Sequence, residues 1–175
     1  MKNKFYVLLA IDGAGKSILL DNIKKIKGWS LASYDNQYVP QKYEMIACID
    51  NKIENHTLAY FPKLSKDFKS SLYSTYIYYL NDMVIQLRKQ SHVICNSYYY
   101  KIIAKNILFD GEQSYFHNQW RMLPKPDKVI LLNTDPEIAW SRISNPNSLF
   151  WNEYYGDKPT QKGYIQFQQD LNTTF

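Results

Sequence analysis

The chain has 175 residues, of which 45% are apolar, and this size suits one globular domain with a core of its own. Its formal charge is +5, from 21 basic and 16 acidic side chains. This balance suits anionic small ligands and permits weak nucleic-acid contact, but no run of five like charges marks a dedicated nucleic-acid site. No apolar stretch reaches transmembrane length, which argues against a membrane protein.

Two features bear on the compartment. Cys48 and Cys95 both stand among apolar residues, which predicts two buried thiols in a reducing environment. The apolar run near the N-terminus is only about seven residues long and continues into a glycine turn without a small-residue cleavage site. We therefore interpret it as a strand and not as a signal peptide, and we expect a cytoplasmic protein.

The first element in chain order is a strand over residues 5–11, followed by Asp12-Gly-Ala-Gly-Lys-Ser17 and a helix-periodic stretch from Ile18. A strand, a glycine turn ending in Gly-Lys-Ser and a helix form the arrangement of a P-loop. Gly13 and Gly15 let successive backbone N–H groups, with that of Ala14 between them, converge on phosphate oxygens without clashes at Cβ. The alternative is a chance glycine turn, which the flanking strand and helix make the weaker interpretation.

The P-loop interpretation assigns a role to each side chain at the start of the helix. The helix N-terminus, from Lys16 to Ile18, would add its partial positive charge, and Lys16 would reach the β- and γ-phosphates of ATP. The hydroxyl of Ser17 would bind Mg²⁺. One departure is that Ala10 stands where the usual pattern begins with glycine.

The remaining elements alternate between strands and helices. Glycine, proline and capping signals together with apolar periodicity predict strands over 29–34, 92–95 and 128–133. The same signals predict helices over 18–27, 42–55, 65–89, 98–108 (which begins at three tyrosines), 113–122, 136–145 (which ends at a break) and 160–171. The clearest helix start is Asp135-Pro136-Glu137, with an N-cap, a proline at the first position and an acid in the first turn.

This alternation predicts an α/β fold with a parallel sheet and helices on both faces. Ligands in such folds bind at the carboxyl ends of the strands, where the P-loop, Asp35, Asn96 and Thr134 would gather. Residues 1–175 are expected to form one domain with an exposed loop over 144–159. The 16 tyrosines are either core side chains or, in part, the lining of a pocket for a ring-bearing ligand.

Three passages resemble the thymidylate kinases, within the nucleoside and nucleoside monophosphate kinases. They are the P-loop at 12–17, the segment 126–142 (PDKVILLNTDPEIAWSR), which resembles the strand and helix leading into the family's lid, and, more weakly, Gly163-Tyr-Ile165. The resemblance implies a three-layer α/β/α P-loop kinase fold, ATP and Mg²⁺ as cofactors, a small-molecule phosphoryl acceptor and a lid-like loop over 144–159. Family members often form homodimers, so the resemblance implies a homodimer here.

The resemblance also implies roles for individual residues. Asp12 would touch a sugar hydroxyl or the acceptor, and Arg142 would lie at the base of the lid near adenine or the donor phosphates. An exposed arginine paired with a neighbouring acid is an equally good interpretation of Arg142. Tyr73 and Tyr76, one helical turn apart, would face the acceptor cavity, with core packing as the alternative.

The acceptor half departs from the family pattern. An Asp-Arg pair normally follows the third strand, and here Asn96-Ser97 takes its place; of the acid and arginine after the second strand, only Asp35 remains. The loop 144–159 contains no arginine. These departures favour a kinase for an acceptor other than thymidylate, unless Lys101 or Lys105 replaces the lost charge. The alternative is a catalytically degenerate nucleotide-binding or interaction module.

Overall fold

The computed structural model describes residues 3–53, 60–110 and 118–175. In this part of the chain the sheet has four strands, all parallel, in the order β2-β3-β1-β4. They are β1 (Phe5–Ala10), β2 (Ser30–Ala32), β3 (Val93–Asn96) and β4 (Lys128–Leu132). The predicted α/β class with a parallel sheet is confirmed.

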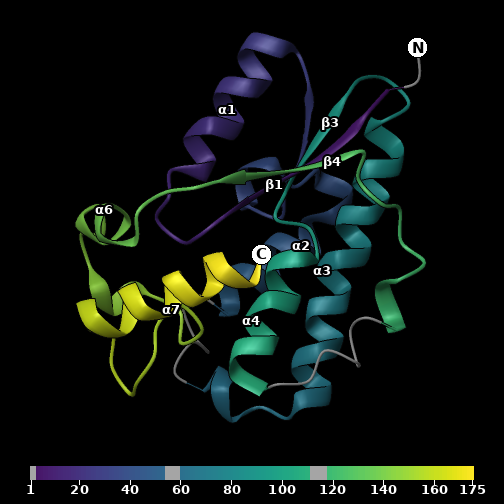
Figure 1. Ribbon diagram of the computed structural model, residues 1–175. Coiled ribbons are helices and arrows are strands. Elements are labelled where there is room, and N and C mark those ends of the chain that lie inside the picture. The colour runs from purple at the N-terminus through teal and green to yellow at the C-terminus, as the bar shows by residue number, and fades with distance from the viewer. Residues whose placement is uncertain (1–2, 54–59, 111–117) are drawn as a thin grey trace.

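Helices lie on both faces of the sheet around β1, β2 and β3, as Figure 1 shows, whereas Val129, Ile130 and Leu131 of β4 are exposed. The α-helices are α1 (Lys16–Lys27), α2 (Glu44–Lys52), α3 (Lys66–Leu87), α4 (Tyr100–Asp110), α6 (Pro136–Ser141) and α7 (Gln161–Thr174), with short 3-10 turns at Asn36–Tyr38, Gln41–Tyr43, Phe61–Lys63 and Pro146–Ser148. Helix α1 lies on one face and α3 on the other, while α6 and α7 lie beyond the carboxyl ends of the strands. The three-layer α/β/α arrangement follows from this distribution.

The side chains of β1 explain the layers. Successive residues of a strand point to opposite faces, so Leu8 packs with Leu20 of α1, whereas Val7 and Leu9 pack with residues of α3 such as Leu80. Because both faces of β1 are covered, its residues form a nearly continuous apolar run.

The helix ends follow the capping signals in the sequence. Gly28 adopts a left-handed conformation (φ 62°) at the end of α1, and its N–H donates to Lys24 O. The carboxylate of Asp135 accepts a hydrogen bond from Glu137 N at the start of α6. Ser65 Oγ accepts one from Phe68 N in the same way at the start of α3.

Two details differ from the sequence-based expectations, and two predicted helices extend beyond the described residues. The second strand covers only Ser30–Ala32, because the chain already turns at Asp35, whose N–H donates to Ser33 Oγ. Cys48 is exposed, so the prediction of two buried thiols is wrong for it: α2 turns Ile46 toward the core and Cys48 away from it. Residues 54–55 of the predicted helix 42–55 and residues 113–117 of the predicted helix 113–122 lie outside the described residues.

The longest helix, α3, carries polar groups along its length, and none of the described helices combines the length and apolar character needed to cross a bilayer.

Candidate active site

The P-loop connects β1 to α1 through two glycines in the left-handed region. Gly13 has φ 70° and Gly15 has φ 88°, conformations that other residues adopt at a cost. The first amide of α1 with an intrahelical acceptor is that of Leu19, which donates to Gly15 O over 3.2 Å. The amides of Lys16, Ser17 and Ile18 have no intrahelical acceptor and point out of the helix start, which is the geometry of an anion site.

Gly13 is required for steric reasons as well. A Cβ at this position would lie 3.0 Å from Ala139 O in α6 and 3.1 Å from the hydroxyl of Tyr164 in α7. That hydroxyl donates a 2.6 Å hydrogen bond to Asp12 O and thereby fixes the start of the turn. Helices α6 and α7 therefore both contact the P-loop backbone.

Two residues from the segment after β4 also contact the P-loop. Arg142 Nη1 donates to Gly13 O over 3.3 Å, and among the described residues its guanidinium pairs with no acid. Arg142 therefore lies against the P-loop backbone and not in a surface ion pair within the described part of the chain. The hydroxyl of Thr134 donates to Ala14 O over 3.4 Å, so Thr134 gathers at the loop as expected.

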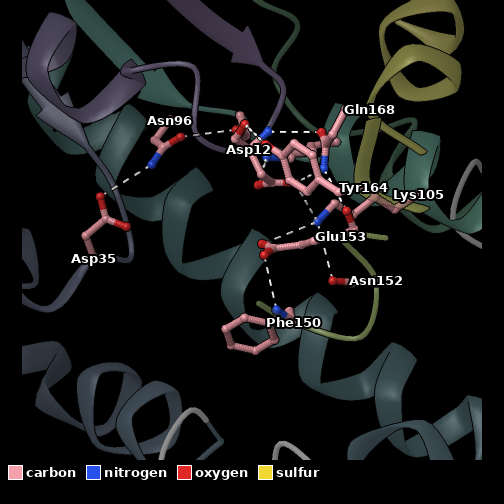
Figure 2. A network of polar contacts seen from close by, with 11 residues as sticks. Asp12, Asp35, Asn96, Lys105, Phe150, Asn152, Glu153, Tyr164 and Gln168 are labelled. Carbon is pink, nitrogen blue, oxygen red and sulfur yellow. Dashed lines mark hydrogen bonds and ion pairs between the residues drawn. The ribbon is translucent and has the colours of Figure 1, made fainter. Parts of the chain in front are cut away.

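Asp12 is the centre of a partly buried polar network (Figure 2). Lys101 of α4 forms an ion pair with Asp12 Oδ1, and Lys105, one turn later, lies 3.2 Å from Oδ2. Gln168 of α7 donates to Oδ2 over 3.3 Å and accepts from the Asp12 amide over 3.1 Å. Glu153, in the loop before α7, lies 3.9 Å from Lys105 Nζ and accepts from Gln168 Nε2 through its carbonyl over 3.0 Å.

Burial and charge set the protonation states of this network. Burial alone would raise the pKa of Asp12, but Lys101 and Lys105 outweigh it and hold the pKa well below its usual range. Burial lowers the pKa of Lys101 to about 8 against the attraction of Asp12. Burial, helped by the charge of Asp12, raises the pKa of Glu153 to about 7. Burial also lowers the pKa of Lys16, while Asp12 and then Asp35 counteract the shift.

A second polar group follows β2 and β3. Asn96 Nδ2 lies 3.4 Å from both Ser33 Oγ and Asp35 Oδ2, and the Ser97 hydroxyl donates to Asn96 Oδ1 over 3.1 Å. Ser97 and Tyr98 have φ values of 60° and 48°, which are uncommon for residues other than glycine. Strained backbone of this kind is concentrated at functional sites, and it places Ser97 on the wall of the adjoining cavity.

The cavity has a volume of about 370 Å³ and lies between α3, α4 and the loop 144–159. Asp12, Ser97, Lys101, Lys105 and Glu153 line its polar end. Its other walls carry eight aromatic side chains, Tyr34, Phe61, Tyr73, Tyr76, Tyr98, Phe109, Phe150 and Trp151, together with charged residues that include Asp50, Lys66, Asp67 and Lys69. A polar end beside the P-loop and aromatic walls beyond it suit a ligand with a ring at one end and a reacting group at the other.

The structure brings most of the sequence-predicted site residues together. Tyr73 and Tyr76 line the cavity, and Tyr76 is also buried in the core (7% exposed). The side chain of Ile18 is 70% exposed and apolar, so the group of Ile18 that can bind a phosphate is its backbone amide. Sequence reasoning missed Glu153 and Gln168: the spacing of Gln168 four residues after Tyr164 was a usable signal, whereas Glu153 in its loop offered none.

The residues present fit a magnesium ion held mainly by a nucleotide. Mg²⁺ usually keeps several waters and takes one or two protein ligands together with phosphate oxygens. Ser17 stands at the start of α1, so its hydroxyl can supply an oxygen beside the phosphates.

Comparison with known proteins agrees with this geometry. No protein-family model matches the chain. A protein of Methanocaldococcus jannaschii named "Probable thymidylate kinase" is 23% identical over 171 residues, which are 97% of this chain and 84% of that protein. The solved structure of thymidylate kinase from Candida albicans aligns with a TM-score of 0.61 and 19% identity, over 99% of this chain and 76% of that one.

Deoxyadenosine kinase from M. mycoides with bound dATP aligns with a TM-score of 0.59 and 15% identity, over 98% of this chain and 83% of that one. The chain has the fold of the P-loop nucleoside monophosphate kinases and is thymidylate kinase-like. The resemblance seen in the sequence is thereby confirmed. At 19% and 15% identity, these two structures show the fold of this chain.

Proposed function

We propose that the protein transfers the γ-phosphoryl group of ATP to a nucleoside-like or nucleotide-like acceptor held in the cavity. The observation that carries this proposal is the position of the P-loop: Lys16 and the free amides of α1 open onto the same edge of the sheet as the polar end of an aromatic-walled cavity. Phosphoryl transfer requires little covalent chemistry from the protein beyond positioning and positive charge. The relatives support a kinase of this type.

In this proposal the donor side consists of the P-loop and Arg142. Lys16 and the amides of Gly13 to Ile18 bind the phosphates, and Ser17 contributes to the Mg²⁺ site. Arg142, whose Nη1 lies 3.3 Å from Gly13 O, adds positive charge next to the transferred group. Bound Mg²⁺ neutralises charge on the phosphate oxygens as it develops.

We propose that Asp35, which lies beside Asn96 and next to the cavity lining rather than on it, accepts the proton of an acceptor hydroxyl. Asn96 cannot do so because an amide does not titrate usefully. Asp12 is a poor base, because Lys101 and Lys105 hold its pKa well below the usual range. Asp35 is bound to neither lysine in the described structure, and its Oδ2 is held by the amide of Asn96. This assigns Asp12 to positioning and Asp35 to proton transfer.

The acceptor that fits this site carries little charge at its reacting end. Ser97 offers one neutral hydroxyl where an arginine would offer a fork of charged donors. Lys101 and Lys105 do lie at the cavity, but both form ion pairs with Asp12. We therefore propose a neutral nucleoside-like hydroxyl over thymidylate, whose dianionic phosphate would have to displace Asp12 from the lysines.

The test of donor binding is a calorimetric titration of ATP with Mg²⁺ into the wild type and Lys16→Ala. Removal of the lysine charge should weaken ATP binding by about tenfold or more, because charge-assisted contacts contribute about 1.5–3 kcal/mol each. Lys25→Ala removes an exposed lysine of the same helix and is the matched control. Equal ATP affinity in wild type and folded Lys16→Ala would contradict the proposal.

A degenerate nucleotide-binding module is the second candidate, because Asn96-Ser97 lacks both a base and an arginine. A panel of deoxynucleosides and their monophosphates separates the two candidates. A kinase forms ADP well above the background hydrolysis of ATP when one acceptor is present. A binding module shows only background ADP with every acceptor, although ATP still raises its melting temperature by mass action.

A further inference from the structure

Gln168 is a fully buried polar residue on an otherwise apolar helix face. The buried residues of α7 are Tyr164, Phe167, Gln168 and Leu171, which recur at helical spacing, and Phe167 and Leu171 pack with Ala104 of α4. Gln168 is 0% exposed, and a polar group buried away from water destabilises the folded state unless it is hydrogen-bonded. The contacts of the amide therefore have to explain why glutamine stands at this position.

The amide of Gln168 makes three hydrogen bonds that join two segments of the chain (Figure 2). Its Oε1 accepts from Asp12 N over 3.1 Å, and its Nε2 donates to Asp12 Oδ2 over 3.3 Å. The same Nε2 donates to Glu153 O over 3.0 Å. Asp12 begins the P-loop, whereas Glu153 belongs to the loop 144–159, and both residues line the cavity. One side chain thus connects the donor loop with a wall of the acceptor cavity.

A carboxamide has the groups that this place requires. The side chain has to accept from a backbone N–H and also donate to a carboxylate and to a carbonyl oxygen. An ionised carboxylate would instead bring an oxygen next to Asp12 Oδ2, and an ammonium group would leave Asp12 N without an acceptor. A side chain that only filled space would need none of these groups, so packing alone does not account for Gln168.

Helix α7 also holds Asp12 from one turn earlier, because the Tyr164 hydroxyl donates to Asp12 O over 2.6 Å. Together Tyr164 and Gln168 contact the N–H, the carbonyl and the carboxylate of Asp12. Lys105 of α4 reaches both Asp12 and Glu153 as well, but it contacts their side chains. Gln168 bonds a backbone group of each segment, Asp12 N and Glu153 O, so it constrains the course of the chain itself.

We propose that Gln168 is a positioning residue of the active site, which holds the P-loop backbone at Asp12 and the cavity wall at Glu153 in one relative arrangement. Phosphoryl transfer depends on such an arrangement, since small displacements of the reacting groups reduce the rate strongly. The inference rests on the proposed function for its effect on phosphoryl transfer. The connection between the two segments can be measured without it.

Gln168→Met keeps the length of the side chain and removes both polar groups of the amide. Hydrogen exchange, followed by mass spectrometry on the protein without ligands, should show Asp12 and residues 150–155 exchanging about 5- to 100-fold faster than in wild type. A role in packing alone would raise exchange in α3 and β3 by the same factor, through global unfolding. Gln169→Met makes the same change on the exposed face of α7 and is the matched control.

Steady-state kinetics with the best acceptor provide the second measurement. In Gln168→Met, kcat should fall by about 10- to 100-fold, because the donor loop and the acceptor cavity lose their fixed arrangement. ATP affinity should change little, because Lys16 and the amides at the start of α1 are untouched.

Gln168→Glu keeps the shape of the side chain and makes the connection depend on pH. Asp12 and Glu153 lie against this position, and Lys101 and Lys105 pair with Asp12 from α4. A protonated carboxyl still offers one acceptor and one donor, whereas an ionised one repels Asp12 and donates nothing. Exchange of residues 150–155 should therefore be close to that of wild type at pH 5 and faster than in wild type at pH 8.

Three results would overturn the inference: exchange in Gln168→Met that rises uniformly or not at all, a local rise without a fall in kcat, and wild-type exchange in Gln168→Glu at pH 8. If the wild type phosphorylates no acceptor but the local rise in exchange is present, the connection through Gln168 is supported and the proposed kinase activity is contradicted.

Discussion

Glu153 makes the stability of the protein depend on pH in an unusual direction. Its pKa rises from an ordinary value of 4.5 to about 7 on folding, chiefly through burial. Because the folded state holds the proton more tightly than the unfolded chain, the contribution of Glu153 to stability is greatest at low pH. This contribution decreases as the pH rises from 4.5 toward 7, and it levels off above 7.

The magnitude follows from the size of the shift. Each unit of pKa change corresponds to about 1.4 kcal/mol, so the full effect is about 3 kcal/mol, of which about 2–3 kcal/mol falls between pH 5 and 8. Glu153→Gln keeps the shape of the side chain and an oxygen acceptor for Phe150 N but does not titrate. The variant should gain stability relative to wild type as the pH rises, by about 2–3 kcal/mol over this range.

Thermal unfolding at several pH values between 5 and 8 measures this difference. For a chain of this length, the melting temperature of Glu153→Gln should rise relative to wild type by about 5–10 °C across the range. Other titrating groups are present in both proteins and cancel, and Glu44→Gln, at an exposed glutamate, is the matched control. Parallel curves for wild type and Glu153→Gln would refute the reasoning.

Two further substitutions test the site. Gly13→Ala places a Cβ 3.0 Å from Ala139 O at a φ of 70°. The free energy of unfolding should therefore fall by about 1–3 kcal/mol, and ATP affinity should fall with it. A melting temperature equal to that of wild type would count against backbone strain at this position. Asp35→Asn removes the proposed base, so kcat with the best acceptor should fall by about 100-fold or more while ATP affinity changes little. An unchanged kcat would show that another group accepts the proton.

The donor site could be predicted from the sequence because its signal is local. The glycines, Lys16 and Ser17 are neighbours along the chain, and the apolar run before them identifies the strand that presents them. The same holds for the capping residues Gly28 and Asp135, whose partners lie within four residues. In such patterns, the spacing of the residues along the chain determines their relative positions in the structure.

The acceptor site could be predicted only in part, because its contacts join distant segments. Lys101 and Gln168, which contact Asp12, are 89 and 156 residues away from it in the sequence, so no local pattern predicts these contacts. Asn96 and Ser97 could be located from the end of β3, but Glu153 and Trp151 stand in a loop without periodicity. Their roles depend on α4 and α7 packing beside that loop.

The most direct test of the proposed function follows the γ-phosphoryl group itself. ATP labelled in the γ-phosphate is incubated with the protein, Mg²⁺ and each deoxynucleoside or deoxynucleoside monophosphate in turn, and the labelled products are separated. We predict that label appears in a nucleoside monophosphate, formed from an acceptor with a free hydroxyl, and that Lys16→Ala abolishes its formation. Label found only in inorganic phosphate with every acceptor would contradict the assignment of this protein as a kinase.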